Sequence, residues 1–359
     1  MKTDKKWGAI GIDTIFTFER GKENNMADLN EGVIPLISAR KMNNGVKGFV
    51  SNPTKTIKGG RVITLNNDGD GGAGLAYFQP SDFALDTHVT ALHPKIDISS
   101  SALLYMTASI SKQHSIFGHG RSISLPRAKR IKDMLPVTDA GVPDYKYMEH
   151  YTIRQSTLMQ KKYRLYLENK IAELENSHEV SSVKTITWMP FYISKIFTEI
   201  ERGKRLKKAD HISGNVPYVS STALNNGVDG FIQAPKGTRV FNNCISLANS
   251  GSVGSAFYEP FEFVASDHVT HLKTEGFNKW VYLFLTVAIE KQKCNFNFNR
   301  EINDSRVRQM KIMLPVNSDN KPDFKYMERY TKNMMLKKYK QYLAFLDAKE
   351  KSDADVEGQ

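Results

Sequence analysis

The chain repeats itself: at Pro35–Val50 it reads PLISARKMNNGVKGFV, and at Pro217–Ile232 it reads PYVSSTALNNGVDGFI. Eight of these sixteen positions are identical, with no gap, at an offset of 182 residues. Further matches follow, and the last pairs PDYKYMEHYT at Pro143–Thr152 with PDFKYMERYT at Pro322–Thr331. A solenoid has a much shorter period. The sequence therefore predicts two tandem copies of one unit of about 180 residues.

Each copy divides into two parts of different composition. The first part holds short β-branched runs followed by glycine-rich turns, such as Gly60–Leu65 and Val240–Leu247, which is typical of a mixed α/β globule. Within it, Asn-Asn-Gly-Val recurs at Asn43 and at Asn225 and predicts a tight hairpin turn, because asparagine and glycine tolerate positive φ. The expected fold class is α/β (mixed α+β).

The second part of each copy has the composition of a long helix. Tyr145–Glu175 and Phe324–Lys349 lack glycine and proline and are rich in Lys, Glu, Met, Leu and Tyr. We expect the domain ranges 1–142 (globule), 143–180 (helix), 181–321 (globule) and 322–359 (helix).

Apolar side chains recur along both predicted helices at helical spacing, which marks one buried face. Because two similar globules each carry such a helix, we expect the helices to pair as an antiparallel coiled coil. The expected pairing residues are Met159, Tyr163, Tyr166, Met335, Tyr339, Tyr342 and Leu346.

The charge balance favours an anionic partner. The 359 residues include 50 Lys and Arg against 38 Asp and Glu, a formal net charge of +12, and the pI is about 9.4. Such a surplus points to nucleic acid first and to an acidic membrane surface second. No stretch approaches the ~20 apolar residues that span a bilayer.

Metal chemistry finds little support in the sequence. The two cysteines, Cys244 and Cys294, are too few for a zinc site or a disulfide framework, and a reducing cytoplasm is the simple interpretation. His88 and His268 recur at matching positions, but one histidine per globule is expected to be a satisfied core residue.

Two similar basic globules suit duplex DNA with two half-sites. Lys and Arg neutralise phosphates, and Arg also reads guanine edges, although single residues here could equally be solvated surface charges. Segments that differ between the copies are expected to read different bases. The candidate DNA-binding residues are Arg20, Lys22, Arg40, Lys41, Asn67, Arg121, Arg127, Lys129, Arg130, Arg202, Lys204, Arg205, Lys207, Thr222, Asn249, Arg300, Arg306 and Arg308.

Two sequence patterns resemble catalytic motifs but lack the structural context that those motifs require. Gly69–Gly74 matches G-x-G-x-x-G, but a dinucleotide site needs a helix next, and the strand-like Leu75–Pro80 follows instead. A nuclease-like pattern places Asp144 and Glu168 on one predicted helix, ~36 Å apart, so they cannot converge on one metal ion. No Asn-Pro-Pro-Tyr methyltransferase motif occurs.

The chain resembles a specificity (S) subunit of a restriction–modification system. The similarity rests on the tandem copies, on the Leu-Pro-Val segments at Leu135–Val137 and Leu314–Val316, and on the helical repeats, and it covers about Lys6 to Lys349. Type I subunits usually begin the helix with a Pro-Leu-x-x-Gln-like segment. Here Pro-Asp-Tyr/Phe-Lys-Tyr-Met-Glu stands instead, which is more similar to the BcgI-like type IIB group.

This resemblance implies a function without catalysis. Such a subunit carries two target-recognition domains, binds a bipartite, asymmetric duplex target, and docks a methyltransferase or a fused nuclease–methyltransferase through its long helices. Mg²⁺ and S-adenosylmethionine are then expected on the partner, with no cofactor on this chain, a cytoplasmic location and no membrane contact. The alternative function is a non-enzymatic coiled-coil scaffold or adaptor with incidental basic charge.

Overall fold

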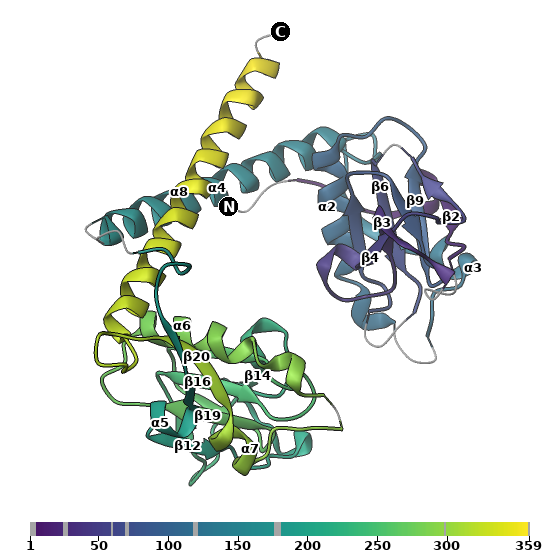
Figure 1. Cartoon of the computed structure of the whole chain (residues 1–359). Helices are drawn as coiled ribbons and strands as arrows, with labels where there is room; N and C mark the ends of the chain where they lie inside the picture. The colour runs from purple at the N-terminus through teal and green to yellow at the C-terminus, as the bar shows by residue number, and fades with distance from the viewer. Residues whose placement is uncertain are drawn as a thin grey trace. The chain divides into compact units, whose positions relative to one another are not determined.

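The computed structural model describes residues 5–23, 28–58, 60–68, 72–117, 121–175, 181–297 and 299–357, apart from the side chains of Lys208 and residues 351–357. The chain forms two compact units, residues 1–163 and 164–359, and the boundary falls inside the first long helix. Each repeat is a globule of short strands and helices with a long helix after it (Figure 1). The predicted mixed α/β class, with a long helix after each globule, is confirmed.

The first repeat runs from β1 to α4. Its strands are β1 (Trp7–Gly11), β2 (Phe16–Arg20), β3 (Glu31–Ile37), β4 (Val46–Val50), β5 (Thr56–Ile57), β6 (Val62–Asn66), β7 (Ala76–Gln79), β8 (Phe83–Leu85), β9 (Val89–Pro94) and β10 (Lys132–Pro136). Its α-helices are α1 (Ile12–Ile15), α2 (Ser100–Ser111), α3 (Leu125–Ala128) and α4 (Tyr145–Leu174).

The second repeat has the same order of elements. Its strands are β11 (Trp188–Tyr192), β12 (Glu199–Arg202), β13 (Ser213–Val219), β14 (Val228–Ile232), β15 (Val240–Phe241), β16 (Cys244–Ala248), β17 (Ala256–Glu259), β18 (Phe263–Ala265), β19 (Val269–Lys273) and β20 (Lys311–Pro315). Its α-helices are α5 (Ile193–Ile196), α6 (Lys279–Glu290), α7 (Asp304–Gln309) and α8 (Phe324–Glu357).

The strands of each repeat assemble in the same topology. In the first repeat one sheet has the order β2-β9-β6-β7, a second has β4-β3-β8-β5, and β1 pairs with β10. The pairing is antiparallel except between β3 and β8, where Leu36 lies opposite Ala84 in parallel register. The second repeat reproduces these three arrangements with β12-β19-β16-β17, β14-β13-β18-β15 and β11-β20.

A helix covers one face of the first sheet in each repeat and closes the core. Leu103 and Met106 of α2 are buried against Ile63, Leu65 and Leu92 of the sheet. Ser99 caps α2 by accepting a hydrogen bond from the Ala102 amide at 3.3 Å, which satisfies one of the free donors at a helix start. Asn278 caps α6 in the same way by accepting from the Trp280 and Val281 amides.

The Asn-Asn-Gly segments form the expected turns. Asn44 (φ 53°, ψ 31°) and Asn226 (φ 52°, ψ 38°) lie in the left-handed region, where asparagine and glycine are the preferred residues. Each turn joins the two strands of a hairpin, β3–β4 or β13–β14. These residues therefore have a structural role.

The long helices contact each other within the second unit. Arg164 of α4 pairs with Asp347 at 2.7 Å and with Glu350 at 3.1 Å, and Glu175 lies 3.7 Å from Lys340. The rings of Tyr166 and Tyr339 meet edge to face, with centroids 6.3 Å apart.

The buried face of α4 differs from the expected stripe. Met159 is 65% exposed, and Tyr163 and Tyr166 are also exposed, while Leu167 and Leu174 are buried. The buried face of α4 therefore includes Leu167 rather than the neighbouring Tyr166. The pattern misled because Met and Tyr tolerate water through their sulfur and hydroxyl groups, whereas Arg164, counted as polar, lies partly inside.

On α8 the expected stripe is nearer to the observed one. Leu346 is buried, and Met335 and Tyr339 are half-buried, but Tyr342 is exposed and Leu343 takes its place on the inner side. Apart from the contact between Tyr166 and Tyr339, the predicted role of these residues in helix pairing stays a prediction.

The rejected catalytic patterns have structural roles where the structure describes them. Gly72–Gly74 belongs to a turn that leads into strand β7, and Gly69–Gly71 lies outside the described residues. Asp144 accepts hydrogen bonds from the Tyr147 amide at 3.0 Å and from Lys5 at 2.5 Å. Among the described helices, none is both long enough and apolar enough to cross a bilayer.

Candidate nucleic-acid interface

Four loops of the first repeat meet at one end of the sheet β2-β9-β6-β7. The Asn66 side chain donates from Nδ2 to the Arg40 carbonyl at 3.0 Å. The Asn67 amide donates to the His88 carbonyl at 2.9 Å, and the Ile123 amide donates to the Asn67 carbonyl at 2.6 Å. These bonds bring the segments that carry Arg40, Lys41 and Arg121 into one loop cluster, although these segments lie far apart in the sequence.

The second repeat builds the same loop cluster. The Asn249 amide donates to the His268 carbonyl at 2.8 Å, and the Ile302 amide donates to the Asn249 carbonyl at 2.9 Å. The Ser252 amide donates to the Ser221 carbonyl at 2.9 Å, which joins the segment that carries Thr222. Arg300 stands two residues before Ile302, as Arg121 stands two before Ile123.

Two of the candidate residues do not face solvent. Asn67 and Asn249 are buried, and their Oδ1 atoms accept hydrogen bonds from Thr90 at 2.8 Å and from Thr270 at 3.0 Å. A buried amide must satisfy its polar atoms inside the protein. The prediction that these asparagines read DNA bases is therefore wrong, because they hold the loop cluster together from within.

The remaining candidates lie at or near the surface. Arg202 and Thr222 are half-buried, and the exposed ones are Arg20, Lys22, Arg40, Lys41, Arg121, Arg127, Lys129, Arg130, Lys204, Arg205, Lys207, Arg300, Arg306 and Arg308. Some of these arginines also brace the main chain: Arg127 donates to the Ser122 carbonyl at 2.8 Å, and Arg306 to that of Glu301 at 2.6 Å. A guanidinium has five donors, so such a bond leaves others for phosphate oxygens.

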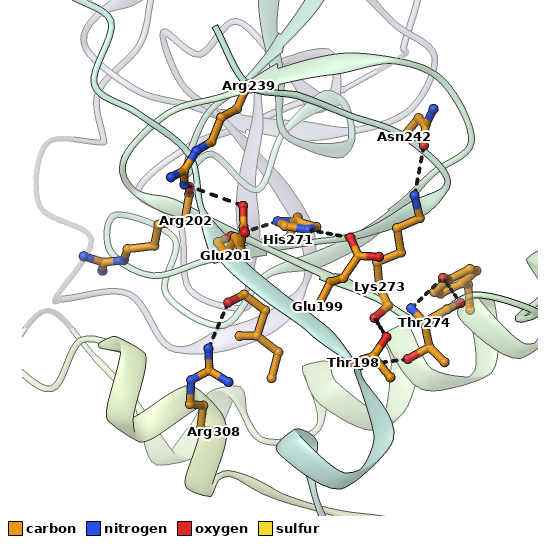
Figure 2. A network of polar contacts seen from close by, with 12 residues as sticks. Thr198, Glu199, Glu201, Arg202, Arg239, Asn242, His271, Lys273, Thr274 and Arg308 are labelled. Atoms are coloured by element: carbon orange, nitrogen blue, oxygen red, sulfur yellow. Dashed lines mark hydrogen bonds and ion pairs between the residues drawn. The ribbon is translucent and has the colours of Figure 1, made fainter.

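Two arginines of the second repeat join helix α7 to strand β12. Arg202 Nε lies 3.2 Å from Asp304 Oδ1, and Arg308 donates to the Ile200 carbonyl at 3.1 Å. Figure 2 shows Arg239 and Arg308 approaching this strand, where Arg239 donates to the Arg202 carbonyl at 3.0 Å. Arg202 and Arg308 thus have a structural duty in addition to the predicted DNA contact.

A buried histidine lies at the centre of the same network. His271 donates from Nδ1 to the Glu201 carbonyl at 3.0 Å (Figure 2). Its ring stacks on Phe241 with centroids 4.1 Å apart. Burial lowers the pKa of His271, which favours the neutral ring. His271 is a satisfied core residue of the second repeat, and Ala91 lies at the matching place in the first.

The repeated pair His88 and His268 contradicts its prediction. Their side chains are 56% and 58% exposed, so they are surface residues rather than core residues. His88 bonds to Asp68 at 3.0 Å, which raises the pKa of His88, and His268 lies 2.6 Å from the Ser250 hydroxyl. Both histidines belong to the loop clusters. Their recurrence at matching positions of the two copies is the sequence feature that could have indicated this place.

Away from the loop clusters, each repeat also has a groove where the long helix begins. The first has a volume of about 650 Å³ and the second of about 760 Å³. Helix α2 and strand β10 line the first groove, and helix α6 and strand β20 line the second. The two grooves have the same residue type at seven matching positions: Trp7/Trp188, Leu104/Leu283, Lys112/Lys291, Gln113/Gln292, Met134/Met313, Tyr151/Tyr330 and Thr152/Thr331.

Several polar groups distinguish the first groove from the second, and Asp133 is the buried one among them. Asp133 lines the first groove and accepts a hydrogen bond from Ser109 at 2.8 Å. Burial raises the pKa of Asp133 to about 6. Ile312 stands at the matching position of the second repeat, so the second groove is the more apolar one.

A duplicated α/β globule with a basic loop cluster in each copy defines a DNA-recognition protein with two recognition domains. The family model of the type I restriction modification DNA specificity domain matches this chain twice, at residues 4–165 and 185–343. The chain therefore belongs to the family of restriction–modification specificity subunits, and the predicted family is confirmed.

Individual proteins are also similar to this chain. The specificity subunit S.BcgI of a type II restriction enzyme from Heyndrickxia coagulans is 30% identical over 335 residues, which cover 92% of this chain and 94% of that protein. The S subunit of a type I system from M. genitalium has a solved structure that matches with a TM-score of 0.46 and 14% identity, covering 98% of this chain and 96% of that one. The HsdS subunit from Thermoanaerobacter tengcongensis matches with a TM-score of 0.33 and 11% identity, covering 95% and 91%.

Proposed function

We propose that this specificity subunit binds a bipartite, asymmetric duplex DNA target, one tract to each repeat, and is itself non-catalytic. The observation that supports this most is the loop cluster, which is built twice on two matching backbone hydrogen bonds with different side chains at its surface. Shared residues hold the loops and phosphates, while differing residues read different bases. Arg40 and Lys41 in the first cluster stand where Thr222 and Ala223 stand in the second.

The chemistry is assigned to a partner subunit. S-adenosylmethionine, Mg²⁺ and base extrusion belong to a methyltransferase or to a fused nuclease–methyltransferase. The chain then acts in the cytoplasm as the recognition component of the complex, without a cofactor of its own.

The grooves are the proposed docking surface for that partner. Met134 and Met313 are exposed in them, and an exposed apolar hollow marks a protein interaction site more often than a DNA site. Lys112 and Lys291 give each hollow a cation at the same point. The matching occupant is a partner segment with an apolar ridge and a nearby carboxylate.

Docking is tested by co-expressing the chain with the methyltransferase-bearing subunit of its own restriction–modification system. The double variant Met134→Asp and Met313→Asp is expected to lose co-purification while the isolated chain still binds DNA. Ile96→Asp, a similar change at another exposed apolar residue, is the matched control and should retain the complex. Retention of the complex by the groove variant would show that the partner docks elsewhere.

The DNA-binding proposal is tested by sequencing modified bases in a host that carries the complete system. A single asymmetric motif with two specified tracts and an unspecified spacer is expected. Exchange of Arg40 and Lys41 for Thr and Ala should alter one tract and leave the other unchanged. An absence of sequence-specific modification, or equal weakening at every sequence, argues for a scaffold or for phosphate contact alone.

A further inference from the structure

The two Asn-Asn-Gly hairpins present the same exposed pattern with opposite charge. Strand β4 alternates, so that Lys47 and Phe49 point outward while Val50 is buried, and β14 does the same with Asp229, Phe231 and Ile232. Phe49 is 57% exposed and Phe231 is 58% exposed. Residues two apart share one face of a strand. Each hairpin therefore offers a charged residue and a phenylalanine side by side.

A glycine separates these two residues in both copies. At Gly230 an added Cβ would meet nothing within 4 Å, so neither packing nor backbone conformation of this chain requires a glycine there. A glycine inside a strand lowers its stability and often marks a place where another molecule approaches the backbone closely. Gly230 alternates to the other face of β14 from Asp229 and Phe231, and the missing side chain leaves that side of the strand open.

In the second repeat Asp229 lies at the loop cluster. A cavity of about 490 Å³ is lined by Asp229 and Gly230 together with Arg205, Lys207 and His268. Arg205 and Lys207 are predicted phosphate contacts, and His268 is bonded into the cluster. The hairpin thus lies where a DNA backbone held by those cations would bring base edges.

Charge decides what each hairpin can read. Lys47 offers only donors, which suit the O6 and N7 acceptors of guanine, whereas Asp229 offers only acceptors, which suit the N4 amino group of cytosine. A carboxylate repels phosphate, so Asp229, which shares its cavity with the carboxylate of Asp267 as well as with Arg205 and Lys207, suits a base or another donor. The phenylalanine supplies apolar contact to the groove, such as a thymine methyl group.

We propose that Lys47 and Asp229 are specificity-determining residues that read one base each, guanine in one tract and cytosine in the other, with Phe49 and Phe231 packing beside them. This inference rests on the proposed DNA binding. It concerns which residues read bases, and it adds the acidic Asp229, which a search for basic residues alone would not select.

The test selects preferred sequences from a randomised duplex library with the full-length chain. Asp229→Lys is expected to replace cytosine by guanine at one position of one tract, with a change in preference of about tenfold or more. Lys47→Asp should make the reverse change in the other tract only. Phe231→Ala should weaken binding without changing the preferred base at the Asp229 position.

A charge-matched control separates base reading from general electrostatics. Glu262→Lys changes the net charge by the same amount at an exposed residue outside the cavity. It should tighten binding to all sequences and leave the motif unchanged. If wild-type chain selects a two-tract motif that Asp229→Lys leaves intact, the hairpin inference fails. If wild-type chain selects no duplex at all, the proposed function fails first.

Discussion

Glu259 of strand β17 is a buried carboxyl that the first repeat replaces with an amide. Its Oε1 accepts a hydrogen bond from Ser246 at 2.8 Å, and burial raises the pKa of Glu259 to about 7 from an ordinary value of 4.5. Gln79 occupies the matching position and donates to Thr64 at 3.0 Å and to the Asn44 carbonyl at 3.1 Å. The native second repeat therefore holds a proton that the unfolded chain releases between these two pH values.

Stability should fall as this proton is lost. Below about pH 4.5 the carboxyl is protonated in both states and costs nothing, and between about pH 4.5 and 7 the unfolded state is increasingly favoured. Glu259→Gln should add about 1–3 kcal/mol to the free energy of unfolding at pH 8 and almost nothing at pH 4.5. Urea unfolding of the full chain at both pH values measures this difference. The reciprocal variant Gln79→Glu should lose stability as the pH rises, and a pH-independent effect in either variant would contradict the explanation.

A substitution of Asn249 tests whether this residue stabilises the fold or reads DNA bases. Its side chain accepts from Thr270 inside the protein, so Asn249→Ala removes the acceptor of that buried hydrogen bond. The free energy of unfolding should fall by about 1–3 kcal/mol, and the preferred DNA sequence should not change. Denaturant titration and library selection give the two readings. A changed motif at full stability would restore Asn249 as a base-reading residue.

At the scale of elements, helix α4 shows why a hydrophobic stripe can be assigned to the wrong face. The apolar count favoured Met159, Tyr163 and Tyr166, whose side chains also tolerate water. Burial selected Leu167 and Leu174 instead. Arg164 lies beside them because Asp347 and Glu350 of α8 satisfy its guanidinium, and a single-helix pattern does not contain those partners.

Truncation of neighbouring residues distinguishes the two faces of α4. Leu167→Ala removes a fully buried side chain and should lower the free energy of unfolding by about 2–5 kcal/mol. Tyr166→Ala, on the exposed side, should cost less than about 1 kcal/mol. Thermal unfolding of both variants makes the comparison, and equal losses would support the original stripe.

At the scale of the whole molecule, net charge governs how strongly DNA is held. The formal charge is +12, and most of the candidate arginines and lysines are exposed. If six to ten of them neutralise phosphates, affinity should fall by ~10³–10⁵ between 50 and 200 mM salt. Titration of a duplex that contains the selected motif measures the slope of log Kd against log salt. A flat dependence would mean that the basic residues do not contact the DNA backbone.

The duplication, the mixed α/β class and the long helix after each globule were determined by the sequence alone. Repeats, turn residues and helical composition are local signals, and a second copy in the same chain tests each of them internally. The Asn-Asn-Gly turns are an example, because the required positive φ depends on the residue itself.

Only the tertiary structure decided which polar residues face solvent. Asn67 and Asn249 are buried and hydrogen-bonded inside the protein, whereas the side chain of His88 is exposed. Arg202 pairs with Asp304. All of these environments arise from contacts between segments that are distant in sequence. The grooves, and the cavity that Asp229 and Arg205 line together, also form only when distant segments pack against each other. A side chain's exposure depends on what packs over it, and that packing is settled only when distant segments meet.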